Sequence, residues 1–274
     1  MAENPSELYL DLLKRVLTRI GFDEGLVAAS PSNTLTGRIG AAMLSPLLAR
    51  RGLVLARPAE VDVAARAVGK DWPAAAETMI GLARLDNLQH CIQEVVRAGV
   101  PGDLVEAGVW RGGASIFMRA ALAAYGDRDR CVWAADSFAG LPRPDSRYEA
   151  DAGDQHWTFD HLAVSLEEVQ ENFARYGLLD DRVRFLKGWF RDTLPGAPIA
   201  AISVLRLDGD MYESTMDTLV HLHPKVSPGG YVIVDDYGAV AGCRRAVEDF
   251  RRSANIDDPI DEIDWTGVYW RRSQ

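Results

Sequence analysis

The chain has 274 residues, 47% of them hydrophobic and 26% charged, and its formal net charge is −10. This composition is typical of a globular protein with one large domain or a domain with an added lid. No apolar run approaches the roughly 18–20 residues of a membrane span, so we expect no membrane as a partner. An acidic surface would repel nucleic acid, so we do not expect nucleic acid as a partner either. Three widely spaced cysteines and a polar N-terminus without a secretory signal favour a cytoplasmic protein.

The N-terminal part of the chain is expected to be mainly helical. Leucine, valine and isoleucine recur at helical spacing over residues 8–20. Residues 21–60 are interrupted by glycine and proline, which predicts short helical turns joined by mobile loops. This segment could form a lid, a dimer contact or a poorly ordered insertion. Pro73 suits the first turn of a further helix, which would run from about 74 to 98 with a bend near Gly81.

The pattern changes after Gly102, where short apolar runs alternate with helical stretches. The apolar runs are typical of buried parallel strands, and the repeated strand–helix units predict a doubly wound, Rossmann-like α/β sheet. We therefore divide the chain into a helical lid region, 1–102, and a domain, 103–274. The expected strands are 103–107, 131–135, 183–186, 202–207 and 231–234, and the expected helices lie near 113–125, 165–176, 212–223 and 241–253.

Two short strands at the end of the chain, 262–265 and 268–270, predict an antiparallel hairpin at the sheet's edge. The long connection from Gly140 to Ala163 holds His156, His161 and several aromatic residues. Connections of this length are usually functional or disordered. This one could cover a substrate or pack on the surface.

Ligands of doubly wound sheets bind at the carboxyl ends of the strands, so the residues there carry the functional prediction. The first strand ends in Glu106, followed by a turn with the spacing E-x-G-x-x-x-G-G rather than the G-x-G-x-x-G of dinucleotide sites. A carboxylate at this place can hold an ammonium group, whereas it would repel a pyrophosphate. Asp136, at the end of the second strand, can accept hydrogen bonds from ribose hydroxyls, or it could cap a turn.

The fourth and fifth strands end in aspartates. Asp208 and Asp210 follow one strand, and Asp235 and Asp236 follow the other. If the strands are parallel neighbours, these carboxylates meet at one edge of the sheet, where a divalent cation would offset their repulsion. Oxygen-only ligands favour Mg²⁺ first, with calcium or manganese next. For Asp210 the alternative is the N-cap of the following helix.

At this point the sequence resembles the macrocin O-methyltransferase family, S-adenosylmethionine (SAM)-dependent enzymes that methylate sugar hydroxyls on antibiotics. The resemblance runs from Tyr9 to Trp270, and residues 27–60 are longer than the usual N-terminal region of the family. Five stretches carry it: DLVEAGVWRGGASIFMRA (103–120), WAADSFAGLPRPD (133–145), RFLKGWFRDTLP (184–195), LRLDGDMYEST (205–215) and GGYVIVDDYGA (229–239).

The resemblance implies the class I methyltransferase fold, SAM and Mg²⁺ as cofactors, a small glycosylated natural product as the acceptor, and a homo-oligomer, most simply a dimer. It implies that Asp208 is the general base. It also implies a set of binding residues. Glu106, Gly108, Ser115, Thr78 and Met79 would hold the methionine part of SAM, Asp136 and Ser137 the ribose, Lys187, Gly188 and Trp189 the adenine, and Asp208, Asp235 and Asp236 the metal.

Three other functions compete with this hypothesis. A nicotinamide-dependent oxidoreductase would need the G-x-G-x-x-G turn, which is missing. A non-catalytic module that binds SAM or another ligand would have no use for three carboxylates at the strand ends. A catechol-type O-methyltransferase also uses metal-bound diols, so only the family resemblance favours a sugar over a phenol.

Overall fold

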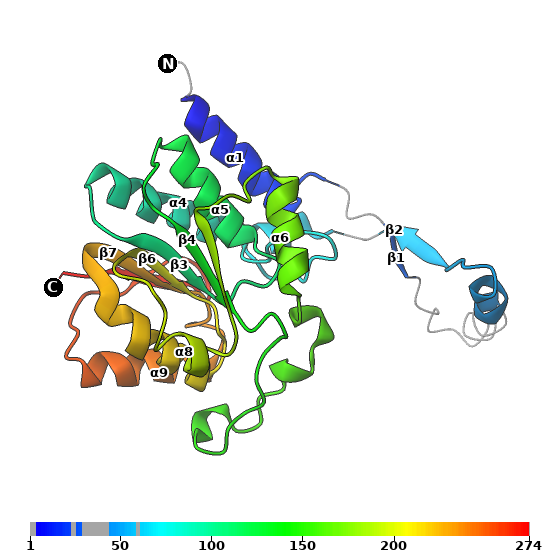
Figure 1. Ribbon diagram of the computed structural model, residues 1–274. Coiled ribbons are helices and arrows are strands. Elements are labelled where there is room, and N and C mark those ends of the chain that lie inside the picture. Colours follow the sequence, from blue (N-terminus) through cyan, green and yellow to red (C-terminus); the bar gives the residue numbers. More distant parts are fainter. Residues whose placement is uncertain (1–3, 23–25, 29–43, 59–60, 274) are drawn as a thin grey trace.

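The computed structural model describes residues 4–22, 26–28, 44–58 and 61–273. A seven-stranded sheet runs through the molecule with helices on both faces (Figure 1). Its strand order is β5-β4-β3-β6-β7-β9-β8, and β3 to β7 are parallel, whereas β9 is antiparallel to both of its neighbours. The strands are β3 (Asp103–Ala107), β4 (Val132–Asp136), β5 (Val183–Lys187), β6 (Ile202–Leu207), β7 (Val226–Val234), β8 (Asp261–Glu262) and β9 (Val268–Arg271).

This sheet confirms the doubly wound fold and the terminal antiparallel hairpin that the sequence predicts. The chain leaves β3 toward β4 and β5 on one side, and returns to β6 and β7 on the other. The switch point therefore lies between β3 and β6, where the carboxyl ends of the strands leave room for a ligand.

Helices cover both faces because the strand residues alternate between two apolar cores. Leu104 and Val204 pack into one core with α1, α4, α5 and α6, and their neighbours Val105 and Leu205 pack into the other with α8 and α9. The helices are α1 (Pro5–Thr18), α3 (Val63–Ala67), α4 (Gly81–Arg97), α5 (Gly113–Ala124), α6 (Leu166–Arg175), α7 (Phe190–Thr193), α8 (Tyr212–Leu222) and α9 (Ala241–Ser253). The 3₁₀ turns of the described part are η1 (Glu149–Asp151), η2 (His156–Thr158), η3 (Asp160–Leu162) and η4 (His223–Lys225).

The predicted helix over 74–98 is wrong in its first part, because α4 begins only at Gly81. Gly81 has a φ of +75°, and a Cβ there would lie 2.5 Å from the backbone nitrogen of Gly69, so the helix cannot continue through it. The preceding residues 73–80 have no regular secondary structure. The N–H groups of Glu77 and Thr78 donate to the carbonyl of Leu17, which ties this segment to the end of α1.

Part of the prediction for residues 21–60 lies outside the described residues. In the described part, residues 44–49 are helical as expected, but β1 (Leu26–Ala28) and β2 (Ala56–Pro58) form an antiparallel pair that we did not predict. Figure 1 shows this two-stranded ribbon standing apart from the main sheet. Several apolar side chains near it are exposed to solvent, namely Leu44, Leu47, Leu53, Val54 and Leu55. Among the described helices, none is long and apolar enough to cross a membrane.

Candidate active site

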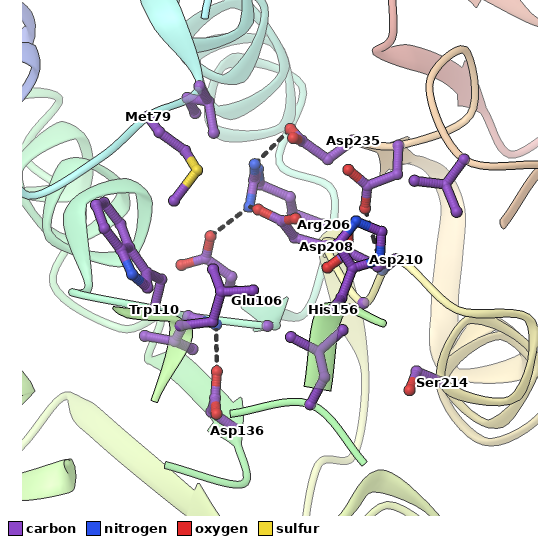
Figure 2. A pocket seen from close by; sticks show the side chains of 18 of the residues that line it. Met79, Glu106, Trp110, Asp136, His156, Arg206, Asp208, Asp210, Ser214 and Asp235 are labelled. Atoms are coloured by element: carbon purple, nitrogen blue, oxygen red, sulfur yellow. Dashed lines mark hydrogen bonds and ion pairs between the residues drawn. The ribbon is translucent and has the colours of Figure 1, made fainter. Parts of the chain in front are cut away.

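A cavity of about 850 Å³ opens at the carboxyl ends of the central strands. Its floor is made by the residues that follow β3, β4, β6 and β7, and its walls come from the irregular segment 69–80 and the connection 140–163. The expected site residues that line it are Thr78, Met79, Glu106, Gly108, Asp136, Ser137, Trp189, Asp208, Asp235 and Asp236. Figure 2 shows that charged side chains from both halves of the sheet meet in this pocket.

Glu106 lies at the end of β3 with only 1% of its surface exposed. Its carboxylate accepts hydrogen bonds from Arg206 (2.6 Å) and from the Ser115 hydroxyl at the start of α5. Burial raises the pKa of Glu106 to about 7, although Arg206 and Ser115 act in the opposite direction. Ser115 does not line the cavity itself, and it reaches the site through this hydrogen bond.

Gly108 passes directly against the loop after β6. Its φ is +95°, and a Cβ there would lie 1.7 Å from the carbonyl oxygen of Asp208. Only glycine fits this close approach. The sequence indicated a glycine-rich turn here, but it did not show that the turn packs against the backbone of Asp208.

Asp136 holds the turn after β3 in place. Its two oxygens accept hydrogen bonds from the N–H groups of Val109 and Phe138, both at 2.7 Å, and burial raises its pKa. The structure therefore supports the alternative that Asp136 organises a turn, and a carboxylate oxygen has a second lone pair with which to accept another donor. The neighbouring Ser137 donates its hydroxyl to the carbonyl of Gly140 (2.7 Å).

The predicted adenine residues lie at the end of β5. Trp189 lines the cavity, whereas Lys187 is exposed. Gly188 has a φ of +141°, and a Cβ there would lie 2.7 Å from the Thr193 side chain. The backbone therefore turns tightly at Gly188, between an exposed lysine and a tryptophan that faces the cavity.

The structure brings Asp208, Asp235 and Asp236 together, and one carboxylate oxygen from each lies within 4.8 Å of the others. Burial raises the pKa of Asp208, with Asp235 acting in the same direction and Arg206 in the opposite one. Burial and the nearby Asp210 and Asp208 raise the pKa of Asp236 well above its usual range. A group of oxygen donors with this mutual repulsion fits a hard divalent cation.

Two buried arginines, which the sequence analysis missed, hold this acidic cluster. Arg206 on β6 is 2% exposed and contacts Glu106, Asp208 and Asp235. Arg84 at the start of α4 contacts the other oxygen of Asp235 and also Asp264 (3.0 Å). The available signal was a single charged residue in the buried strand over residues 202–207, because a charge there needs a buried partner.

Asp210 is not the N-cap of α8, contrary to the alternative considered from the sequence. Met211 occupies that position without a side-chain hydrogen bond, and Asp151 supplies the cap from the connection 140–163. The Asp151 carboxylate accepts hydrogen bonds from the N–H groups of Tyr212 (2.6 Å) and Glu213 (3.0 Å). Asp210 instead lines the cavity, and burial and the charge of Asp208 raise its pKa.

The connection 140–163 packs over the cavity. His161 stacks on Phe159 and meets the Trp72 ring edge-on, with centroids 4.6 Å apart in the second pair, and so joins this connection to the segment 69–80. The carbonyl of His161 accepts a hydrogen bond from Trp110 Nε1 (2.8 Å). His156 lines the cavity, and its Nδ1 lies 2.7 Å from Asp154.

Comparison with known proteins gives consistent matches along the whole chain. The profile of the Macrocin-O-methyltransferase (TylF) family matches residues 6–272. The 8-demethyl-8-(2,3-dimethoxy-alpha-L-rhamnosyl)-tetracenomycin-C 4'-O-methyltransferase of Streptomyces olivaceus is 50% identical, over 100% of this chain and 95% of the relative. The mycinamicin III 3''-O-methyltransferase of Micromonospora griseorubida is 47% identical, over 97% of both chains.

A solved structure agrees with these matches. The O-methyltransferase NovP superimposes with a TM-score of 0.82 at 46% identity, over 98% of this chain and 100% of NovP. The demethyldecarbamoylnovobiocin O-methyltransferase of Streptomyces niveus is 56% identical, over 75% of this chain and 79% of the relative. The fold that this chain shares with NovP is the class I methyltransferase fold.

Proposed function

Because the chain belongs to the macrocin O-methyltransferase family and is a SAM-dependent O-methyltransferase, we propose that it methylates a hydroxyl of a deoxysugar on an antibiotic-type natural product, with Mg²⁺ in the site. The observation that carries this proposal is that two separate sets of carboxylate side chains line the same cavity. Glu106 and Asp136 lie at the ends of β3 and β4, and Asp208, Asp235 and Asp236 lie at the ends of β6 and β7.

The first group suits SAM. Glu106 would accept the ammonium group of the methionine part, with Ser115, Thr78 and Met79 around it and Gly108 admitting the ligand close to the backbone. Asp136 and Ser137 would bind the ribose hydroxyls. The adenine would lie against the segment made by Lys187, Gly188 and Trp189.

The second group suits the acceptor. The three aspartates offer oxygen ligands alone, within 4.8 Å of one another, which fits Mg²⁺. When bound, the cation would make neighbouring sugar hydroxyls more acidic and orient them. Asp208 follows β6 at the floor of the cavity, where its carboxylate would take the proton of the acceptor hydroxyl.

The chemical step then balances without a further reactant. The acceptor oxygen forms a bond to the methyl carbon, the sulfur–methyl bond breaks, and its electron pair stays on sulfur. Asp208 takes the hydroxyl proton. The product S-adenosylhomocysteine (SAH) would have a neutral thioether sulfur in place of the sulfonium, so the acidic cluster would have no anionic leaving group to stabilise.

The region 1–102 would act as a lid and as the contact of a homodimer in the cytoplasm. The exposed apolar side chains Leu47, Leu53 and Val54 support this part of the proposal, because a partner copy would remove them from water. Sedimentation of the wild type and of the L53E/V54E variant tests it. We expect a dimer for the wild type and a monomer for the variant, and a monomeric wild type would contradict the contact.

Calorimetric titration with SAH, with NADH as the control, tests the cofactor. Micromolar binding of SAH alone is the expected result, and binding of NADH alone would overturn the proposal. Turnover is then measured with deoxysugar glycosides and with catechol, each with Mg²⁺ and with EDTA. We expect methylation of a glycoside that EDTA abolishes, whereas methylation of catechol alone would assign a phenolic acceptor instead.

A further inference from the structure

Arg206 connects the two groups of carboxylates. In the sheet it lies directly opposite Glu106, since these two residues are paired in the register of β3 and β6. Both side chains point to the face that α4 and α5 cover, and Figure 2 shows the guanidinium between Glu106 and Asp235. Its Nη1 lies 2.6 Å from Glu106 and 2.9 Å from Asp208, and its Nη2 contacts Asp235.

The guanidinium is buried, with only 2% of Arg206 exposed, so these carboxylates rather than water compensate its positive charge. One positive charge is thus shared by carboxylates that would bind two different ligands. Away from water, charges at these separations act strongly on one another.

We propose that Arg206 is a positioning residue that couples the SAM ammonium site to the metal site, so that a cation in one site weakens binding in the other. This inference rests on the proposed function. A cation held by Asp208 and Asp235 repels the guanidinium and compensates the charge of these two carboxylates. Arg206 then pairs mainly with Glu106. Glu106 then has less capacity for the ammonium group. By linkage, the effect on each affinity is the same in both directions.

Arg84 provides the comparison within the same network. It contacts the second oxygen of Asp235, and its other described partners are Asp264 and the carbonyl of Gly69. Glu106 is not among them. Arg84 therefore balances the charge of Asp235 without contacting Glu106, and among the residues that the structure describes only Arg206 contacts both groups of carboxylates.

The first test needs no variant. The Kd of SAH is measured by calorimetry for the wild type in EDTA and in saturating Mg²⁺, and the Kd of Mg²⁺ is measured with and without SAH. We expect each ligand to weaken the other by about fivefold or more, by equal factors. The coupling fails, with the proposed function intact, if both ligands bind and neither affinity changes. If no Mg²⁺ binds at all, both the metal site and the coupling are overturned.

The second test uses two carboxylates of the SAM site. Glu106 contacts Arg206, whereas the described contacts of Asp136 are with the backbone of Val109, Trp110 and Phe138 and with Ser137. E106Q should weaken Mg²⁺ binding by about fivefold in the absence of SAM, because Arg206 then turns fully to Asp208 and Asp235. D136N should change it by less than about twofold. Equal shifts in the two variants would overturn the coupling.

R206K keeps the positive charge at this position but removes the planar guanidinium. A lysine ammonium is a point charge and lacks the fork that lets Arg206 donate to Glu106 and Asp235 at once. We expect R206K to bind SAH with the same Kd in EDTA and in Mg²⁺, and R84K, as the matched control, to keep the wild-type coupling factor. Coupling that persists unchanged in R206K would assign it to direct repulsion between the two ligands. Circular dichroism verifies that each variant is folded.

Discussion

Replacing Gly108 by alanine is expected to disrupt the site through the backbone alone. The new Cβ would lie 1.7 Å from the carbonyl oxygen of Asp208 and 2.6 Å from its carbonyl carbon. These backbone atoms cannot move aside as a flexible side chain would. The ends of β3 and β6 would have to separate, although the N–H of Asp208 donates to Ala107 (2.8 Å) and that of Gly108 to Ala135 (2.9 Å).

Gly126 offers a matched control for the magnitude. It also has a positive φ, +74°, but a Cβ there would meet nothing within 4 Å. Both variants therefore carry the backbone cost of about 1–2 kcal/mol for an L-residue in the left-handed region. Only G108A adds the cost of overpacking, about 1–3 kcal/mol. We expect G108A to lose about 2–5 kcal/mol of unfolding free energy, and G126A about 1–2 kcal/mol.

Urea unfolding of the two variants and the wild type measures this difference, and calorimetry with SAH measures the site. G108A should bind SAH at least about tenfold more weakly, corresponding to about 1.4 kcal/mol or more of lost binding free energy. G126A should bind it as the wild type does. Similar losses of stability in both variants, with SAH affinity retained in G108A, would refute the argument from close approach.

Three further predictions follow from the site. D208N should lower kcat by about 10²–10⁴-fold, because the variant loses the general base and one ligand of the metal; steady-state kinetics measures this, and full turnover of D208N would contradict both roles. D151A should lose about 1–2 kcal/mol in urea unfolding, since α8 loses its cap, and an unchanged midpoint would contradict this role. Asp208 and Asp236 have higher pKa values in the metal-free fold than in the unfolded chain. Their protonation therefore stabilises the metal-free fold at low pH, and this contribution is lost as the pH rises. Mg²⁺ should therefore raise Tm more at about pH 8 than at about pH 6, where it must displace protons; an equal Mg²⁺-induced rise in Tm at both pH values would contradict this prediction.

The sheet could be predicted from the sequence because its strands are short apolar runs buried on both faces. The same regularity explains the prediction that Asp208, Asp235 and Asp236 meet, since parallel neighbouring strands end at one edge. The helix start at Gly81 could not be read in this way. Its positive φ depends on how closely the segment packs against Gly69, which is a tertiary contact rather than a local preference.

The contacts that the sequence did not reveal join residues far apart in the chain. Asp151 caps a helix that starts 61 residues later, and Arg84 reaches Asp235 across 151 residues. Sequence patterns identify residue types at element ends, but they do not show which distant side chain fills an orphan N–H group or balances a buried charge. The cap therefore seemed to belong to the neighbouring Asp210.

The switch point between β3 and β6 divides the chemistry by chain segment as well as by space. Apart from Thr78 and Met79, the residues that would hold the methyl donor lie within 103–189, and those that would hold the acceptor's cation lie within 208–236. The second of these segments could therefore be exchanged while the first is kept. A chimera that takes its second segment from a relative would inherit a different acceptor preference with the same donor pocket, provided that the cross-strand partner of Glu106 is inherited with it.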